Sequence, residues 1–364
     1  MSWDILRWGT NCGLRVADQA GVLKRLRTQS SPIVLMYHGI PRRKPSAIGI
    51  TAVDRDAFAR HMRYLKHNFR IVHPDDFQHY SRPPSSKGKP SVVLTFDDGF
   101  ANNATIVRPI LEELQIAALF FVSTRHLEPG RYLWFIHARA LFTLWPGNRI
   151  QLLGRTWKLG LPAERQQALW AFMKETRSAS IEEIYRGLSY YPVEAFVAPE
   201  VIEEELRGMS ETEVAAISKS HMIVIGSHTC NHPYLTVCTT SQLAEEILGA
   251  KATLDRICGR AITTFAYPAG DYDVRVASAI TRAGFALAFA VNPHTQVTEA
   301  GMAIPRTGIY AAGLGILAAK SYGLFSGYYR SQQLTVKPQS VTAVAALDTA
   351  TVTESRSSTK ELVP

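Results

Sequence analysis

Short apolar runs recur along the chain, and each ends at a group of polar or turn residues. Four of them cover residues 33–37, 91–95, 222–226 and 262–266, and they consist mainly of apolar or β-branched residues. Runs this short, bounded by turn residues, predict buried β-strands. Helical patterns separate them, so we expect the parallel sheet of an α/β fold. In a parallel α/β barrel the carboxyl ends of the strands share one face, and that face holds the active site.

The alternation of strand and helix breaks between about residues 125 and 208. This stretch is mostly helical in pattern and holds four of the six tryptophans. It follows a strand predicted at residues 117–122, so we expect an insertion near the carboxyl ends of the strands. Its tryptophans have two possible roles. They belong to a lid whose rings reach a ligand or a lipid interface, or they form a small core of the insertion itself. The second interpretation is preferred for most of them.

The N-terminal residues 1–30 combine five Lys or Arg with two Asp and interspersed apolar residues. This pattern predicts a basic amphipathic helix, which lies either on an anionic membrane surface or against the outside of the barrel. The sequence leaves both interpretations open. No continuous apolar core follows the first charges, so a secretion signal is not predicted.

The C-terminal part of the chain contains two further patterns. Residues 307–329 are apolar apart from Lys320 and approach the length of a membrane span. The glycines and Lys320 favour the last helices of the barrel instead, with a membrane contact as a secondary hypothesis. Residues 331–364 lack aromatic residues and are rich in Ser, Thr and Ala, which predicts a disordered tail. The barrel itself is expected to span residues 31–330.

Composition limits the classes of partner. The chain has 364 residues, of which 46% are apolar, so it can bury a core of one large domain or two ordinary ones. A formal charge of +9 and a pI near 9.4 favour acidic partners such as anionic lipid, lipid-linked phosphate or an acidic glycan. The sequence contains no nucleic-acid recognition motif, so nucleic acid is not a predicted partner.

The four cysteines are Cys12, Cys230, Cys238 and Cys258, and none forms a C-x-x-C pair. This spacing indicates neither a zinc ribbon nor a disulfide framework. A reducing compartment is the simpler assumption. Together with the missing secretion signal, this predicts a cytoplasmic protein that lies on the inner face of the membrane if its N-terminal helix binds lipid.

Two adjacent carboxylates, Asp97 and Asp98, directly follow the run at residues 91–95. Two acids side by side at a buried strand end are costly, because like charges repel and burial disfavours both. A divalent cation would offset that cost. The alternative is a helix N-cap and a turn, with Asp98 as the cap. This stretch alone does not decide between the two.

A second stretch favours the metal. His228 and His232 are four residues apart and follow the run at residues 222–226. This spacing suits two ligands of one ion. Histidine nitrogen and carboxylate oxygen together suit Zn²⁺, with Co²⁺ or Ni²⁺ as tolerated substitutes.

These motifs resemble the polysaccharide deacetylase family, carbohydrate esterases that include the nodulation-factor deacetylases. The resemblance is carried by Thr95-Phe96-Asp97-Asp98-Gly99, by His228-Thr229-x-x-His232-Pro233 and, more weakly, by Phe265-Ala266-Tyr267-Pro268-Ala269-Gly270. It covers roughly residues 32–310, interrupted by the insertion. The family implies a distorted (β/α) barrel and a metal held by Asp98, His228 and His232.

The resemblance also implies catalytic roles. Asp97 would be the general base that takes a proton from the attacking water. The main-chain N–H of Ala269, where the family usually has an aromatic residue, would donate to the oxyanion. Beside these, His38, Tyr267 and Arg306 are candidates for the pocket.

The chain departs from the family pattern at two positions. Ala266 stands where many members have the arginine that orients the base, and Arg306 is a candidate for the missing positive charge. The late Leu-x-His motif that supplies the general acid has no clean match. His294 is the nearest candidate, and His38 is another.

Three functions remain open. The first is metal-dependent removal of an N-acetyl group from an amino sugar during surface polysaccharide or exopolysaccharide synthesis. The second is the same chemistry on an undecaprenyl-linked amino sugar, including removal of a formyl group, which the basic N-terminus favours. The third is a catalytically silent sugar-binding barrel. Retention of Asp97 beside all three ligand residues argues against the third.

Overall fold

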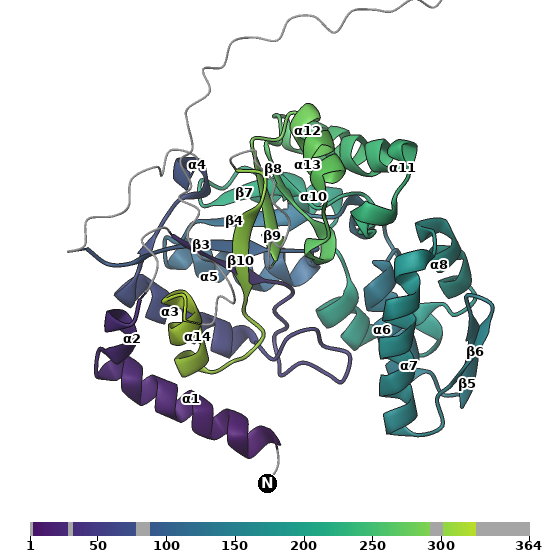
Figure 1. The fold of residues 1–364 in the computed structure, drawn as a ribbon, viewed down its shortest axis with the longest axis horizontal. Helices are drawn as coiled ribbons and strands as arrows, with labels where there is room; N and C mark the ends of the chain where they lie inside the picture. The colour runs from purple at the N-terminus through teal and green to yellow at the C-terminus, as the bar shows by residue number, and fades with distance from the viewer. Residues whose placement is uncertain (1–2, 28–31, 78–87, 292–300, 325–364) are drawn as a thin grey trace, which may run out of the picture.

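Seven parallel strands form a closed ring in the computed structural model, which describes residues 3–27, 32–77, 88–291 and 301–324 (Figure 1). Around the ring they are β1 (Ile33–Tyr37), β10 (Ile304–Gly308), β9 (Leu287–Val291), β8 (Thr264–Ala266), β7 (Ile223–Ser227), β4 (Ala118–Val122) and β3 (Ser91–Phe96), which pairs back to β1. The short strand β2 (Arg70–Ile71) lies beside the start of β3. The fold is therefore the predicted α/β barrel.

Helices cover the outside of this ring. They are α3 (Arg55–Asn68), α4 (Pro74–Phe77), the π-helix η1 (Asn103–Val107), α5 (Arg108–Glu113), α10 (Glu211–Ile217), α11 (Thr240–Ala244), the π-helix η7 (Glu245–Gly249), α12 (Ala250–Cys258), α13 (Val274–Arg282) and α14 (Leu314–Ser321), with the short η6 (Leu235–Val237) and η8 (Pro268–Gly270) in loops. Side-chain caps define several starts: Asp54 accepts from Ala57 N–H, and Ser210 forms the predicted capping box with Glu213.

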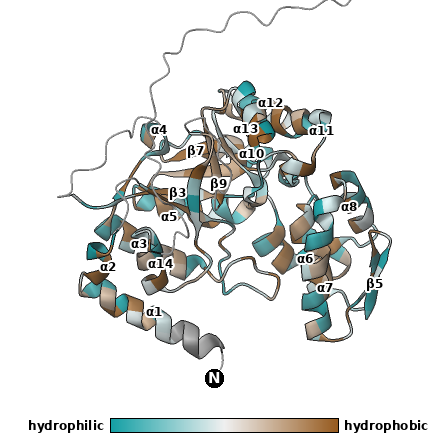
Figure 2. Ribbon diagram, in the orientation of Figure 1, coloured by the Kyte–Doolittle hydropathy of each residue, from teal (hydrophilic) through white to brown (hydrophobic). Residues whose placement is uncertain are grey.

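The strands are buried on both faces. Every residue of β1, β3 and β4 is buried, and Figure 2 shows β3, β7 and β9 coloured as hydrophobic. Alternate residues contribute to two clusters: Leu35 and Leu94 pack with the surrounding helices, whereas Val34 and Val93 belong to a smaller cluster with Phe121. Burial on both faces is typical of parallel strands and explains the nearly continuous apolar runs of the sequence.

Strand β10 corrects an expectation for the C-terminal part of the chain. We interpreted residues 307–329 as helices, yet Arg306 to Gly308 pair with Val34 to Met36 of β1. Pro305 lies inside this short run, and a proline normally argues against an inner strand. The sequence pattern therefore did not indicate β10. Within the described ranges, no helix is long and apolar enough to cross a membrane. The predicted tail, residues 331–364, lies outside the described residues.

The insertion is a substructure with its own core. It contains η2 (Thr124–Leu127), α6 (Trp134–Leu144), α7 (Pro162–Glu175), η3 (Thr176–Ser178), α8 (Ile181–Leu188), η4 (Val193–Ala195), α9 (Pro199–Val201) and the π-helix η5 (Ile202–Leu206). It also contains an antiparallel hairpin of β5 (Arg149–Leu152) and β6 (Arg155–Lys158), which the helical prediction missed. Trp134 and Trp157 lie in its core and Trp145 packs against it, whereas Trp170 is 71% exposed.

The N-terminal helix α1 (Trp3–Gln19), followed by α2 (Val22–Arg25), packs against α14 on the outside of the barrel (Figure 1). The Asn11 side-chain oxygen accepts hydrogen bonds from the N–H groups of Gly315 (2.9 Å) and Ile316 (3.3 Å). These are the second and third residues of α14, so Asn11 supplies the N-cap that Gly313 lacks. A Cβ on Gly315 would lie 2.1 Å from the Asn11 carbonyl oxygen, so this close approach requires glycine.

We therefore predict that Asn11→Ala destabilises the barrel, although Asn11 is remote from β3 and β7. Losing an N-cap costs about 0.5–2 kcal/mol, and urea unfolding followed by circular dichroism measures it. Gln19→Ala on the same helix, at an exposed position, is the control and should unfold like the parent. Equal midpoints for Asn11→Ala and the parent would contradict the capping role.

Candidate active site

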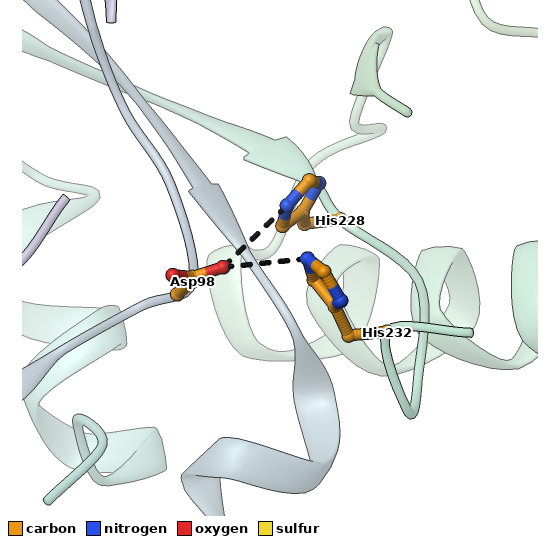
Figure 3. Close-up of side chains that lie close together, drawn as sticks. All are labelled: Asp98, His228 and His232. Atoms are coloured by element: carbon orange, nitrogen blue, oxygen red, sulfur yellow. Dashed lines mark ion pairs between the residues drawn. The ribbon is translucent and has the colours of Figure 1, made fainter. Parts of the chain in front are cut away.

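The predicted ligand residues converge at the carboxyl ends of β3 and β7 (Figure 3). Asp98 follows β3, His228 follows β7, and His232 lies in the loop after it. Both histidines present Nε2 to Asp98 Oδ1, each at 3.6 Å. Ligand atoms about 2.0–2.2 Å from one zinc ion at tetrahedral angles are separated by roughly 3.3–3.6 Å. The two separations from Asp98 therefore fit ligands of a single ion, and all three ligand atoms lie within 4.8 Å of one another.

The electrostatics of the cluster also fit a cation. Asp98 is 1% exposed, and its Oδ2 has no hydrogen-bond partner in the described part of the chain. Burial and the neighbouring Asp97 raise the pKa of Asp98 well above its ordinary value. Burial lowers the pKa of His228 and His232, which favours the neutral imidazole, the form that binds a metal. A divalent ion would stabilise the ionised form of Asp98.

Asp97 has a different partner. Arg306 on β10 forms a two-bond ion pair with it, Nη1 to Oδ1 at 2.6 Å and Nη2 to Oδ2 at 2.7 Å. The Arg306 side chain is fully buried, and its guanidinium lies over the ring of Phe121. Burial alone would raise the pKa of Asp97, but Arg306 and His228 together hold it below the ordinary value. The pKa values of the two adjacent carboxylates are therefore shifted in opposite directions.

The backbone of the site is locally strained. Of the six non-glycine residues with positive φ in the described ranges, four lie in the site motifs: Asp98 (75°), Thr229 (68°), His232 (56°) and Ala269 (53°). Such conformations cost on the order of 1–3 kcal/mol each and persist only where the surrounding contacts impose them. At Asp98 the contact is His126, whose Nδ1 lies 3.1 Å from the Asp98 carbonyl oxygen.

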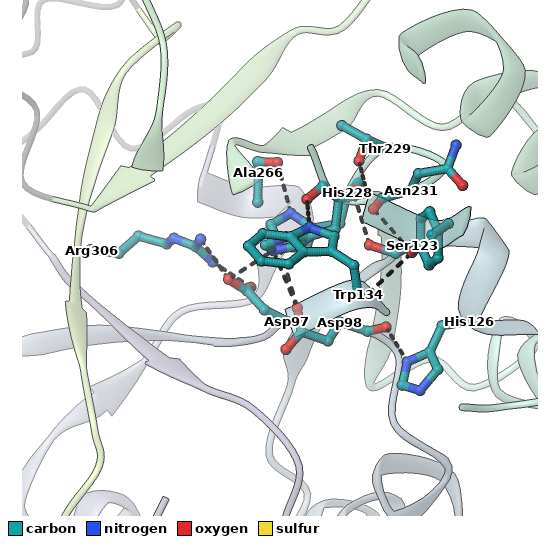
Figure 4. A network of polar contacts seen from close by, with 12 residues as sticks. Asp97, Asp98, Ser123, His126, Trp134, His228, Thr229, Asn231, Ala266 and Arg306 are labelled. Atoms are coloured by element: carbon teal, nitrogen blue, oxygen red, sulfur yellow. Dashed lines mark hydrogen bonds and ion pairs between the residues drawn. The ribbon is translucent and has the colours of Figure 1, made fainter. Parts of the chain in front are cut away.

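His228 is oriented by the strand next to its own. Its Nδ1 lies 2.8 Å from the carbonyl oxygen of Ala266 on β8, which leaves Nε2 directed at Asp98 (Figure 4). A hydrogen bond of this kind selects the ring nitrogen that binds a metal. Ala266 thus orients His228 through its main-chain carbonyl. The positive charge that an arginine at this position would supply comes from Arg306 on β10.

Of the predicted pocket residues, His38 lies at the site and Tyr267 does not. His38 is half-buried at the site: burial lowers its pKa to about 4, and charges on Asp97, Arg306 and His228 act on it. Tyr267 is a correction, because it lies in the core with its hydroxyl donating to the Met302 carbonyl (2.8 Å) and does not line a pocket.

The last two predicted site residues are Ala269 and His294. Ala269 is exposed in the turn after β8. His294 lies outside the described residues.

Sequence reasoning missed several residues around the site. Tyr310 stacks on His38 (5.6 Å between ring centroids), and burial with the charge of Asp97 raises its pKa to about 12. Trp134 donates from Nε1 to the His232 carbonyl at 2.8 Å, and the ring of Phe135 lies 4.6 Å from that of His232. The insertion therefore contacts the loop that carries His232, as its expected place near the carboxyl ends of the strands suggested, although the sequence did not show which residues make the contact.

Comparisons with known proteins found distant similarities. YxkH of Bacillus subtilis (strain 168), whose name assigns it as a polysaccharide deacetylase, is 19% identical over 286 residues, which is 78% of this chain and 73% of YxkH. Streptococcus pyogenes deacetylase PplD in complex with acetate is 17% identical, with a TM-score of 0.49 and coverage of 77% of this chain and 92% of PplD. IcaB from Ammonifex degensii is 18% identical, with a TM-score of 0.48 and coverage of 82% and 97%.

A family model described as polysaccharide deacetylase matches residues 85–153 and 173–288, just over half of the chain. The match includes Asp97, Asp98, His228 and His232 and ends before β10, so Arg306 lies outside it. The chain belongs to the polysaccharide deacetylase family.

Proposed function

We propose that this protein hydrolyses the N-acetyl group of an amino sugar in a surface polysaccharide or exopolysaccharide, with zinc as its metal. The proposal rests on two buried groups of side chains that lie side by side near the end of β3: three candidate metal ligands and one ion pair. Asp98, His228 and His232 present three ligand atoms within 4.8 Å of one another, and Asp97 beside them is ionised by Arg306. Co²⁺ or Ni²⁺ would substitute for zinc with the same donors.

The residues divide the reaction between them. Zinc in a site with three protein ligands supplies Lewis acidity toward water and toward an acyl oxygen. Asp97 takes the proton from the attacking water at Oδ2, the oxygen that lies 3.9 Å from His228 Nε2. The Ala269 N–H, in the turn with φ 53°, is our candidate donor to the oxyanion.

We assign protonation of the leaving amine to His38 in preference to His294. With a pKa of about 4 this imidazole is neutral at rest, so it acts by passing on the proton that Asp97 takes from the water. His38 lies close enough to Asp97 and His228 for their charges to act on it, and its buried Nδ1 has no hydrogen-bond partner in the described ranges. Tyr310 stacks on the ring and limits its orientation. Two departures favoured a catalytically silent barrel: Ala266 and the missing late histidine motif. The position of Arg306 removes the first of these arguments.

A lipid-linked saccharide is our second candidate substrate, because the N-terminal helices carry the features of a membrane-contacting surface. Among the ten exposed large apolar side chains of the described residues, Val16, Val22 and Leu26 lie within eleven residues of one another. Lys24 and Arg25 are exposed beside them. This combination favours peripheral contact with an anionic membrane.

Substitution of the two aspartates separates their roles. Asp98→Asn should lose zinc and activity together, whereas Asp97→Asn should keep zinc while turnover falls by roughly 10²–10⁴-fold, the usual contribution of a positioned base. Released acetate or formate from amino-sugar and lipid-linked panels, with and without chelator, gives the rate, and elemental analysis gives the zinc. Exposed Asp56→Asn is the control. Near-parental turnover in zinc-loaded Asp97→Asn would show that Asp97 is not the base.

The pH profile tests the Arg306–Asp97 pair. Asp97 acts as a base only when ionised, so activity is present above its pKa and lost as pH falls through it. Arg306 lowers that pKa, so Arg306→Met should move the acidic limb of kcat/KM to higher pH, and Arg306→Lys, which keeps a charge, should move it less. Circular dichroism shows whether each variant is folded, because an unpaired buried carboxylate costs several kcal/mol. An acidic limb unmoved in folded Arg306→Met would exclude this electrostatic role.

Vesicle binding tests the membrane contact. Each basic residue near an anionic surface contributes roughly 1 kcal/mol, so Lys24→Glu with Arg25→Glu should weaken binding to phosphatidylglycerol vesicles at least about tenfold. Point substitutions are preferred to deletion of residues 1–28, because deletion also removes the Asn11 cap. Lys158→Glu with Lys174→Glu, on the insertion, is the matched control. Equal binding by both double variants would exclude α2 as the contact.

A further inference from the structure

The loop that joins the two histidines is in a conformation it would not adopt by itself. Thr229 and His232 both have left-handed φ angles, and Thr229 is β-branched, for which such angles are most unfavourable. One bond within the loop, from His232 N–H to Thr229 Oγ1 (3.0 Å), helps to close the turn. Two main-chain bonds also hold it, from Thr124 N–H to the Thr229 carbonyl (3.1 Å) and from Arg125 N–H to the Cys230 carbonyl (3.0 Å). Side chains from two elements on opposite sides of the loop add further restraint.

From the barrel side the restraint is Glu246 of the π-helix η7. This carboxylate is 4% exposed and directed at the loop. Its Oε2 accepts from the N–H groups of Cys230 (3.0 Å) and Asn231 (2.8 Å), and its Oε1 accepts from the Asn231 side-chain amide (2.7 Å). Two of the three bonds satisfy half-buried main-chain donors that the turn leaves without strand or helix partners.

From the insertion side the restraint is the start of α6. Trp134 Nε1 donates to the His232 carbonyl at 2.8 Å, and Figure 4 shows the indole beside the site. Tyr185 on α8 donates from its hydroxyl to the Asn231 carbonyl at 3.4 Å, and Arg125 lies over its ring. Donors from the insertion therefore bind the loop's carbonyl groups, while an acceptor from the barrel binds its N–H groups.

We propose that Glu246 and Trp134 are positioning residues for the metal, and that the insertion is thereby a structural part of the metal site. Neither side chain reaches the three ligand atoms; each acts through the backbone that carries His232. Without these bonds Thr229 and His232 relax toward ordinary φ angles, and the Nε2 of His232 leaves its place 3.6 Å from Asp98 Oδ1. The inference rests on the proposed metal site and is independent of which sugar is the substrate.

Zinc affinity, measured by competition with a chromophoric chelator, tests the proposal without any sugar. Outer partners of metal ligands typically contribute about 10–100-fold in metal affinity. We expect Glu246→Ala to lose about that factor and Glu246→Gln to lose less, because its amide oxygen still accepts from the two main-chain N–H groups. Trp134→Phe, which keeps a ring but lacks the donor, should lose about tenfold. The visible spectrum of the Co²⁺ form should change with affinity, as expected when a ligand is displaced.

Trp157→Phe is the matched control. Trp157 also lies in the insertion core and donates from Nε1 to a main-chain carbonyl, that of Leu152 at 3.1 Å, but it does not contact the loop. It should retain parental zinc affinity and the parental Co²⁺ spectrum at a comparable loss of thermal stability. Parental zinc affinity in folded Trp134→Phe and Glu246→Ala would overturn the proposal. If all variants and the parent fail to bind zinc, the metal site itself is wrong, which is a distinct outcome.

Discussion

Two neighbouring carboxylates buried at the end of one strand are the constraint on which this structure depends. Asp97 and Asp98 are 3% and 1% exposed, and neither is stable as an anion there without a cation of its own. Arg306 supplies one from the opposite side of β1, through the closure of the ring by β10. In the proposed function the second cation is a metal, for which Asp98, His228 and His232 present three ligand atoms. Closing the barrel and supplying Asp97 with its charge partner are thus the same structural event.

The rest of the molecule holds those groups in place. Three π-helical segments lie next to the site: η1 follows the aspartates, η5 ends at Leu206, whose carbonyl contacts His126, and η7 directs Glu246 at the histidine loop. π-Bulges occur frequently at functional sites because they re-aim side chains within a helix. The insertion completes this support through Trp134, and α1 stabilises the helix that follows β10. Elements outside the three sequence motifs therefore hold the side chains of those motifs in position.

The parts of the structure that depend on local sequence were predictable. Apolar runs ending in Asp97-Asp98 and His228 predicted β3, β7 and the shared face of a parallel barrel, and the resemblance brought the three ligand residues together. Other parts depend on distant contacts. Pro305 concealed β10, although Arg306 was a candidate cation; the β5–β6 hairpin lies in a stretch of helical pattern. Tyr267 resembled a pocket residue because it adjoins a motif, yet its hydroxyl binds Met302. Nothing in the pattern around Glu246 indicates that a π-turn directs it at the loop.

X-ray absorption at the zinc edge of the zinc-loaded protein tests the central claim most directly. The account predicts a first shell of two imidazole nitrogens with carboxylate and solvent oxygen at about 2.0–2.2 Å and no sulfur. That result would place the ion on His228, His232 and Asp98. A sulfur ligand at about 2.3 Å would assign the ion to Cys230 or another thiol. A zinc coordination shell with sulfur, or one without imidazole nitrogen, would contradict the account.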